Sequence, residues 1–139
     1  MNLLLNRTVE LLQIGHGAVY IYNEHGEMTV VETNNLTDER FNVVPVTHEV
    51  IEELERGDPV FEGDDTFETL HIGMRQTFTM LVPLTVVSEG TRQLTGMLAL
   101  GPRLSGMGYS SEDETLMTTL VDSVSRSLRV LELIEQNTV

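Results

Sequence analysis

The chain contains no cysteine and no lysine. Without cysteine it cannot form disulfides, thiolate metal sites, thiol nucleophiles or thioether links to a chromophore. All 8 basic residues are arginines that stand singly among 22 acidic residues, so the net charge is −14. Phosphate backbones and anionic membranes are bound by clustered basic side chains. We therefore expect neither nucleic acid nor a membrane among the partners.

Long apolar runs are missing too. No stretch approaches the roughly 20 apolar residues that cross a bilayer, and 139 residues suit one domain with one core. The first residues, MNLLLNRTVELLQ, lack the basic leader of a secretory signal. We expect residues 1–139 to form a single soluble, cytoplasmic domain.

Two helices are predicted in the first half of the chain. Apolar residues at spacings of three and four predict an amphipathic helix over residues 2–14, with Gly15 as its stop. The stripe of this helix is formed by Leu5, Val9 and Leu12. Thr47 is placed to cap a second, short helix that ends at Gly57.

Alternating β-rich runs predict two hairpins. The first has strands at residues 18–23 and 28–33, and the second has strands at 77–87 and 92–102 around the turn Ser-Glu-Gly. The segment PVFE is a brief strand, and residues 63–77 are a loop with one helical turn. This order of elements favours an α+β domain with a mainly antiparallel sheet and helices on its faces.

A long helix is expected to end the chain, over residues 110–136. Ser111 and Glu114 fit a capping box at its start. A second apolar face on this helix is formed by Met117, Val121, Leu133 and Ile134. Together with the stripe of the first helix, this face is expected to pack against another copy and form a homodimer. The competing interpretation is that both stripes lie on their own sheet.

Several motifs in this order resemble the GAF domain family of small-molecule sensors. The stretch LTGMLALGPRLSGMGYSSEDETLMTTLVDSVSRSLRVLELIEQ is similar to the family's closing strand, glycine turn and exit helix. VIEELERGDPVFEGDD and TFTMLVPLTV are similar to its middle helix and a later strand. The resemblance implies a PAS-related sheet with the terminal helices (residues 1–15 and 110–136) on one face. Short helices and loops of the region 16–108 then cover the other face.

Ligand chemistry known in the family fits this sequence unevenly. Tyr109, Asp113 and Glu114 match half of a cyclic-nucleotide signature, but Gly101–Arg103 stand where its other half belongs. First-turn acids of a capped helix explain the same residues. Tetrapyrrole attachment and methionine sulfoxide reduction both use cysteine, so the chain can do neither. Two interpretations of His71 are left: an axial ligand of a haem, or a loop histidine without a ligand. The cofactor is unknown.

The aperiodic middle segment supplies the candidate ligand site. Arg75 is the expected polar anchor of a pocket with apolar walls. The proposed site consists of Phe61, Phe67, His71, Met74, Arg75 and Phe78. The competing interpretation is a core of phenylalanines under a loop, with Arg75 paired to an acid.

Other charged groups are interpreted as solvated surface. His48 and Glu52 lie one helical turn apart but supply only two metal ligands. The acidic run from Glu62 to Glu68 lacks the spacing of a calcium loop. No nucleophile motif and no phosphate-binding glycine loop is present, so we expect no metal and no enzyme activity.

The sequence thus predicts a non-catalytic sensory or regulatory domain of a larger signalling protein. A histidine kinase of a two-component system, a phosphatase and a transcriptional regulator are the expected kinds of parent protein. An unknown small molecule would occupy the pocket, and the terminal helices would relay its presence to an output domain. The main rival is a ligand-free scaffold for dimerisation and signal relay. An enzyme is a third possibility.

Overall fold

The computed structural model describes residues 2–23 and 25–106, together with residues 112, 115 and 119. Most residues for which the sequence analysis makes predictions about the final helix and its start lie outside this described part. They are Tyr109, Ser111, Asp113, Glu114, Met117, Val121, Leu133 and Ile134.

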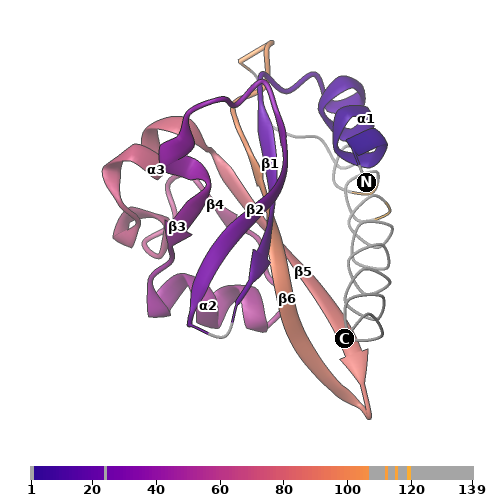
Figure 1. Cartoon of the computed structure of the whole chain (residues 1–139), viewed down its shortest axis with the longest axis vertical. Helices are drawn as coiled ribbons and strands as arrows, with labels where there is room; N and C mark the ends of the chain where they lie inside the picture. The colour runs from indigo at the N-terminus through magenta and orange to yellow at the C-terminus, as the bar shows by residue number, and fades with distance from the viewer. Residues whose placement is uncertain (1, 24, 107–111, 113–114, 116–118, 120–139) are drawn as a thin grey trace.

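The described part is a six-stranded antiparallel sheet with helices on both faces (Figure 1). The helical elements are α1 (Asn2–Leu12), η1 (Glu39–Phe41), α2 (His48–Glu55), η2 (Phe67–Thr69) and α3 (Ile72–Thr77). The strands are β1 (Gly17–Tyr22), β2 (Glu27–Asn34), β3 (Val43–Pro45), β4 (Val60–Phe61), β5 (Met80–Ser88) and β6 (Thr91–Leu100). The strand order is β3-β2-β1-β6-β5-β4. The expected α+β architecture is confirmed.

Each sheet face carries its own apolar core because side chains alternate along a strand. On β1, Ala18 and Tyr20 belong to the core under α2 and α3, whereas Val19 belongs to the core under α1. In Figure 1, α1 lies on one side of the sheet and α2 and α3 lie on the other. The face under α2 and α3 is called the pocket face below, and the opposite one the helix face.

Helix α1 ends earlier than the sequence indicates. Leu12 is its last residue, and Gln13, rather than Gly15, takes the left-handed conformation with φ 54°. The Ile14 N–H donates to the Val9 carbonyl and the Gln13 N–H to the Glu10 carbonyl. These two bonds form a Schellman motif, which leaves a non-glycine residue in a conformation that glycine favours.

Within the described residues, no helix is long and apolar enough to cross a membrane.

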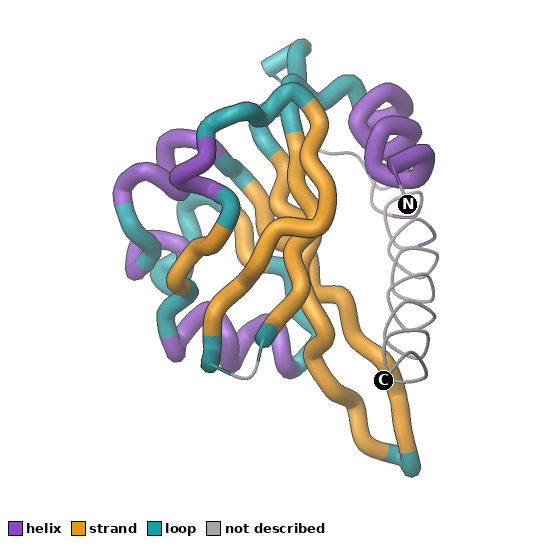
Figure 2. The backbone as a smooth tube through the Cα atoms, viewed as in Figure 1, coloured by secondary structure: helices purple, strands orange, loops and turns teal. Residues whose placement is uncertain are grey.

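The two predicted hairpins are present within a residue or two, apart from one boundary. β5 begins at Met80, because Thr77 still belongs to α3. The turn after β5 has positive φ at both Glu89 (53°) and Gly90 (79°), as in a type I′ hairpin turn. Figure 2 shows this hairpin extending beyond the rest of the sheet. Helix α2 and strand β4 lie where the sequence predicts them. The expected capping bond is wrong, because the Thr47 side chain makes no cap hydrogen bond and its hydroxyl pairs with that of Thr69 at 2.7 Å.

Two regions contain more structure than the sequence indicates. The expected loop at 63–77 holds both η2 and α3. The connection between β2 and α2, for which the sequence analysis names no element, holds η1 and the edge strand β3. Strand β3 pairs with β2 from Glu27 to Thr29. These two regions lie on the pocket face and form the walls of the site described next.

Candidate functional site

A pocket of about 240 Å³ lies between the start of α3 and the segment formed by η1 and β3. Its walls are apolar and are formed by Phe41, Val44, Pro45 and Met74. Arg40 and His71 bring polar groups to it, and Gly73 completes the lining. An apolar cavity with a few polar groups is the usual form of a small-molecule site. This volume lies below the 300–1,000 Å³ or so of sites for drug-sized ligands, so the pocket as it stands fits a smaller molecule than a haem.

The wall at Phe41 is fixed from the sheet below. The hydroxyl of Tyr20, on β1, donates to the Phe41 carbonyl at 2.7 Å, and this bond is buried. Burial also raises the pKa of the Tyr20 phenol, so the hydroxyl remains a donor. The ring of Phe41 meets that of Phe78 edge-on, with 5.8 Å between the ring centroids. Phe41 is thus held in place by the hydrogen bond to its backbone carbonyl and by the aromatic contact of its ring.

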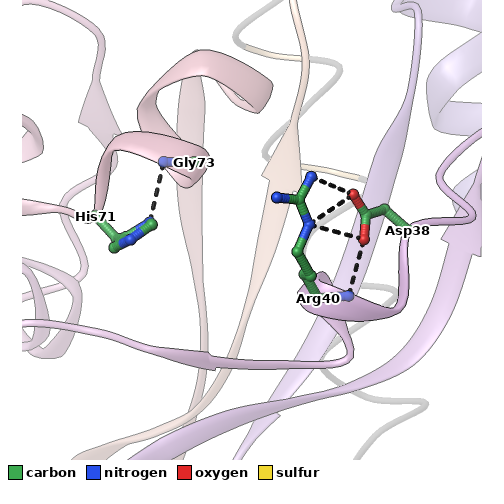
Figure 3. A network of polar contacts seen from close by, with 4 residues as sticks. All are labelled: Asp38, Arg40, His71 and Gly73. Atoms are coloured by element: carbon green, nitrogen blue, oxygen red, sulfur yellow. Dashed lines mark hydrogen bonds and ion pairs between the residues drawn. The ribbon is translucent and has the colours of Figure 1, made fainter.

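Arg40 is held at the rim by its neighbour Asp38 (Figure 3). Nε and Nη2 of the guanidinium donate to the Asp38 carboxylate, and the Arg40 backbone N–H donates to Asp38 Oδ1 at 3.0 Å. These hydrogen bonds hold the pKa of the Asp38 carboxyl below its ordinary value and raise that of Arg40. Both groups are therefore charged, and their charges cancel locally. Sequence reasoning missed Arg40, because nothing in DERF marks it as lining a pocket.

His71 caps α3 from the opposite side of the pocket. Its Nδ1 accepts a hydrogen bond of 3.0 Å from the Gly73 N–H. A ring nitrogen that accepts is unprotonated, so in the neutral imidazole the hydrogen is carried by Nε2. In Figure 3, His71 and Arg40 project from different segments and face a common space. The rim of the pocket therefore offers hydrogen-bond donors.

The structure brings together some of the predicted site residues. Phe67, Met74 and Phe78 are buried in the pocket-face core, and of these Met74 lines the pocket. His71, also predicted, lines it as well. Phe61 is a correction: it pairs with Met80 and packs against the helix-face core, on the other side of the sheet. The sequence pattern of a two-residue strand does not show which face each residue occupies.

Arg75 is the second correction. Its Nε donates to the Leu70 carbonyl at 3.0 Å, and its Nη1 pairs with Glu68 at 3.1 Å. The side chain therefore braces the turn between η2 and α3 and does not line the pocket. This is the acid pairing that the sequence left as the competing interpretation.

The pocket-face core is connected to the chain segments next to both terminal regions. The ring of Phe78 lies 5.9 Å from that of His16, just before β1. The His16 carbonyl accepts from the Gly101 N–H at 2.9 Å, where β6 has ended. One residue earlier, the Gly15 N–H donates to the Pro102 carbonyl, and Arg103 Nε donates to the Leu12 carbonyl at the end of α1. The chain leaving β6 is thereby joined to the end of α1.

The stripe of α1 is buried within the single chain. Leu5, Val9 and Leu12 belong to the helix-face core, where each is at most 7% exposed. This corrects the expectation that these three side chains contact another copy, because their own sheet already covers them. Among the α1 side chains whose burial the structure describes, Leu11 is the exposed apolar one, at 51%. Dimerisation itself stays a prediction.

A second, open cleft of about 840 Å³ lies between α2 and β6. It is lined mainly by polar and charged side chains, among them Glu55, Arg56 and Arg92. Arg56 pairs with Glu53 at 3.0 Å, and the Arg92 guanidinium packs on the backbone of Gly57. The cleft lacks the apolar walls of the first pocket.

The remaining charged candidates take up surface interactions. His48 Nε2 and Glu52 lie 2.8 Å apart on the exposed side of α2. In the acidic run, Asp64 accepts from the Phe61 N–H at 2.9 Å, and Glu68 pairs with Arg75. Among the described residues, no three side chains of the metal-binding types cluster.

Comparisons with known proteins place the fold. No family model and no curated protein sequence matches the chain. Among solved structures, a far-red cyanobacteriochrome photoreceptor is similar, with a TM-score of 0.72, 15% identity, and coverage of 94% of this chain and 85% of that one. The GAF domain/HD domain protein from Geobacter sulfurreducens has a TM-score of 0.70 at 15% identity and covers 94% and 90%. The second GAF domain of DevS from Mycobacterium smegmatis is also similar, with a TM-score of 0.65 and 13% identity. The match covers 99% of this chain and 96% of that domain. The chain has the GAF fold.

Proposed function

We propose that this chain is a non-catalytic sensory or regulatory domain that binds a small molecule in the pocket between α3 and η1–β3. The observation that carries the proposal is the apolar pocket of about 240 Å³ with Arg40 and His71 at its rim. The GAF fold supports a sensory role, because solved structures with this fold include a photoreceptor and a domain of a methyl-accepting chemotaxis protein.

Relay to the terminal helices is the second half of the proposal. A molecule between Phe41 and Met74 would press on the aromatic contacts that lead through Phe78 to His16. His16 and Gly101 are bonded to each other beside the end of α1. A shift at this point would change how α1 and the chain after β6 lie on the sheet. An output domain of a larger cytoplasmic signalling protein, for example in a two-component system, would receive that change.

The experiment is a thermal-shift screen of the chain against a library of small metabolites, run in parallel on Val44→Phe. The phenylalanine ring would enter the cavity that Val44 lines, and Val87→Phe, at a position 66% exposed, is the matched control. We expect a compound that raises the melting temperature of the parent and of Val87→Phe but not that of Val44→Phe. A compound that stabilises all three proteins equally binds elsewhere, and this result would count against the pocket.

A ligand-free scaffold for dimerisation and relay is the second candidate. The exposure of Leu11 (51%) and Leu104 (76%), which lie at the end of α1 and after β6, favours it. Sedimentation of the parent and of Leu11→Ser with Leu104→Ser separates the two candidates. A dimer that dissociates in the double variant, combined with a screen without hits, would favour the scaffold.

A further inference from the structure

The donors at the pocket rim restrict the chemistry of its occupant, and this inference rests on the proposed function. Arg40 uses Nε and one N–H of Nη2 for Asp38, which leaves the other N–H of Nη2 and both N–H groups of Nη1. In Figure 3 this third nitrogen points away from the Asp38 carboxylate, toward the side of the pocket where His71 lies. No hydrogen bond involves Nη1 within the described residues. A ligand group that meets it must accept a hydrogen bond.

His71, on the opposite side of the pocket, also presents a hydrogen-bond donor. His71 Nδ1 is occupied by the Gly73 N–H, so Nε2 is the ring nitrogen with a hydrogen to donate. The carboxylate beside the rim adds no free acceptor, because both oxygens of Asp38 receive N–H groups of Arg40. A ligand that presented a hydroxyl or ammonium hydrogen to these two side chains would meet donors and no acceptor.

Electrostatics separates neutral acceptors from anions. The Arg40 charge is balanced by Asp38 at 2.6 Å, so the rim has donors but no net positive charge. The whole chain carries −14, a field that repels anions as they approach. A carbonyl oxygen can accept a hydrogen bond from either donor without opposing that field.

The walls set the size and the rest of the composition. Phe41, Val44 and Met74 offer apolar surface, and a volume of about 240 Å³ admits a molecule of roughly one ring. We propose that the pocket binds a compact, uncharged and mainly apolar molecule that directs a carbonyl-type acceptor at one of the two rim donors, Arg40 Nη1 or His71 Nε2. The ligand class is thus defined by the N–H groups of Arg40 and His71 that form no hydrogen bond within the described residues.

Four one-ring probes test this with the whole chain, by titration followed in ¹H–¹⁵N NMR spectra. They are acetophenone, benzoate, 1-phenylethylammonium and ethylbenzene, which share a ring and differ in the polar group. We expect the amides of Phe41, Val44, Gly73 and Met74 to shift, and acetophenone to bind about tenfold more tightly than each of the others, as one good hydrogen bond allows. Equal or tighter binding of benzoate or of the ammonium at these amides would overturn the ligand class but keep the pocket. If no probe shifts them, the proposed function fails with it.

Two variants test the assignment of the donors. Arg40→Met should reduce the preference for acetophenone over ethylbenzene severalfold, whereas Arg56→Met, just after α2, should leave it unchanged. Asp38→Asn releases the Arg40 charge and should therefore shift the preference toward benzoate. An unchanged order of probes in both Arg40→Met and Asp38→Asn would show that these donors do not select the ligand. The dispersion of the NMR spectra reports whether each variant is folded.

Discussion

The imidazole Nε2 of His16 donates a hydrogen bond to the carbonyl of Thr77, the last residue of α3. The two residues are 61 positions apart in the chain. Gly101 leaves the space that the ring needs, because a Cβ at that position would lie within 3 Å of three of its atoms. One side chain thus connects α3, which lines the pocket, to the place where the chain after β6 meets the end of α1.

Removal of this ring should loosen α3. His16→Ala loses a hydrogen bond and the contact with Phe78, so we expect a loss of about 1–2 kcal/mol in the free energy of unfolding. Urea denaturation measures the loss, and faster hydrogen exchange at the amides of α3 would locate it. His16→Gln, which can still donate to Thr77, should recover part of the stability. Unchanged exchange at α3 in His16→Ala would contradict the proposed tie.

Gly96 on β6 lies against the backbone of its neighbour strand. A Cβ there would clash with the carbonyl of Tyr20, which belongs to the sheet and cannot rotate away. Gly96→Ala should therefore destabilise the fold by about 2–3 kcal/mol. Thermal unfolding checks this against Gly15→Ala, whose Cβ would make only ordinary contacts at 3.7 Å. Equal stability of the two variants would show that β1 and β6 can separate to make room.

Glu32 should make the folded state less stable as the pH rises. A bulge in β2 after Val30 places it opposite Val19, on the helix face, where it is only 5% exposed. Its carboxylate oxygens have no hydrogen-bond partner within the described residues. Burial raises the pKa of this carboxyl. The folded state then holds the proton at a pH where the unfolded state has released it.

It follows that the contribution of Glu32 to stability is lost as the pH rises from the ordinary carboxyl range through the raised folded pKa. At pH 7, Glu32→Gln should be more stable than the parent by about 1 kcal/mol. The difference should shrink toward pH 4, as measured by urea denaturation at each pH. Glu27→Gln, exposed on the same strand, is the control. A difference that is constant with pH would mean that the carboxyl does not titrate in this range.

Gln13 offers a stabilising change. Its left-handed φ of 54° is unfavourable for a residue with a Cβ, and its side chain is exposed. Gln13→Gly should raise the free energy of unfolding by about 0.5–1 kcal/mol. Gln13→Ala removes the same side chain but keeps the strain, so it should give no gain. If alanine stabilises as much as glycine, the side chain and not the backbone is the source of the cost.

The sequence was sufficient for the elements whose residues repeat regularly. Alternation along β1 and β6 and the stripe of α1 all reflect burial against one face, so the pattern and the structure agree. α3 was predicted only as one turn in a loop because it is short and is capped by His71, a residue that is not among the usual caps.

The second wall of the pocket could not be predicted in the same way. η1 and β3 follow polar residues, and they are held by distant partners: the Tyr20 hydroxyl on Phe41 and the Val30 N–H on the Asn42 carbonyl at 2.7 Å. Those bonds exist only once the sheet has formed. Arg40, the rim residue on that wall, therefore had no local signal.

The central claim is that the pocket holds a small molecule, and native mass spectrometry of the freshly purified chain tests it most directly. The same sample is sprayed gently and then after denaturation, next to Val44→Phe. We predict an excess mass on the gently sprayed parent that disappears on denaturation and is absent from the variant. A parent at its bare polypeptide mass under both conditions, whether monomer or dimer, would contradict the claim.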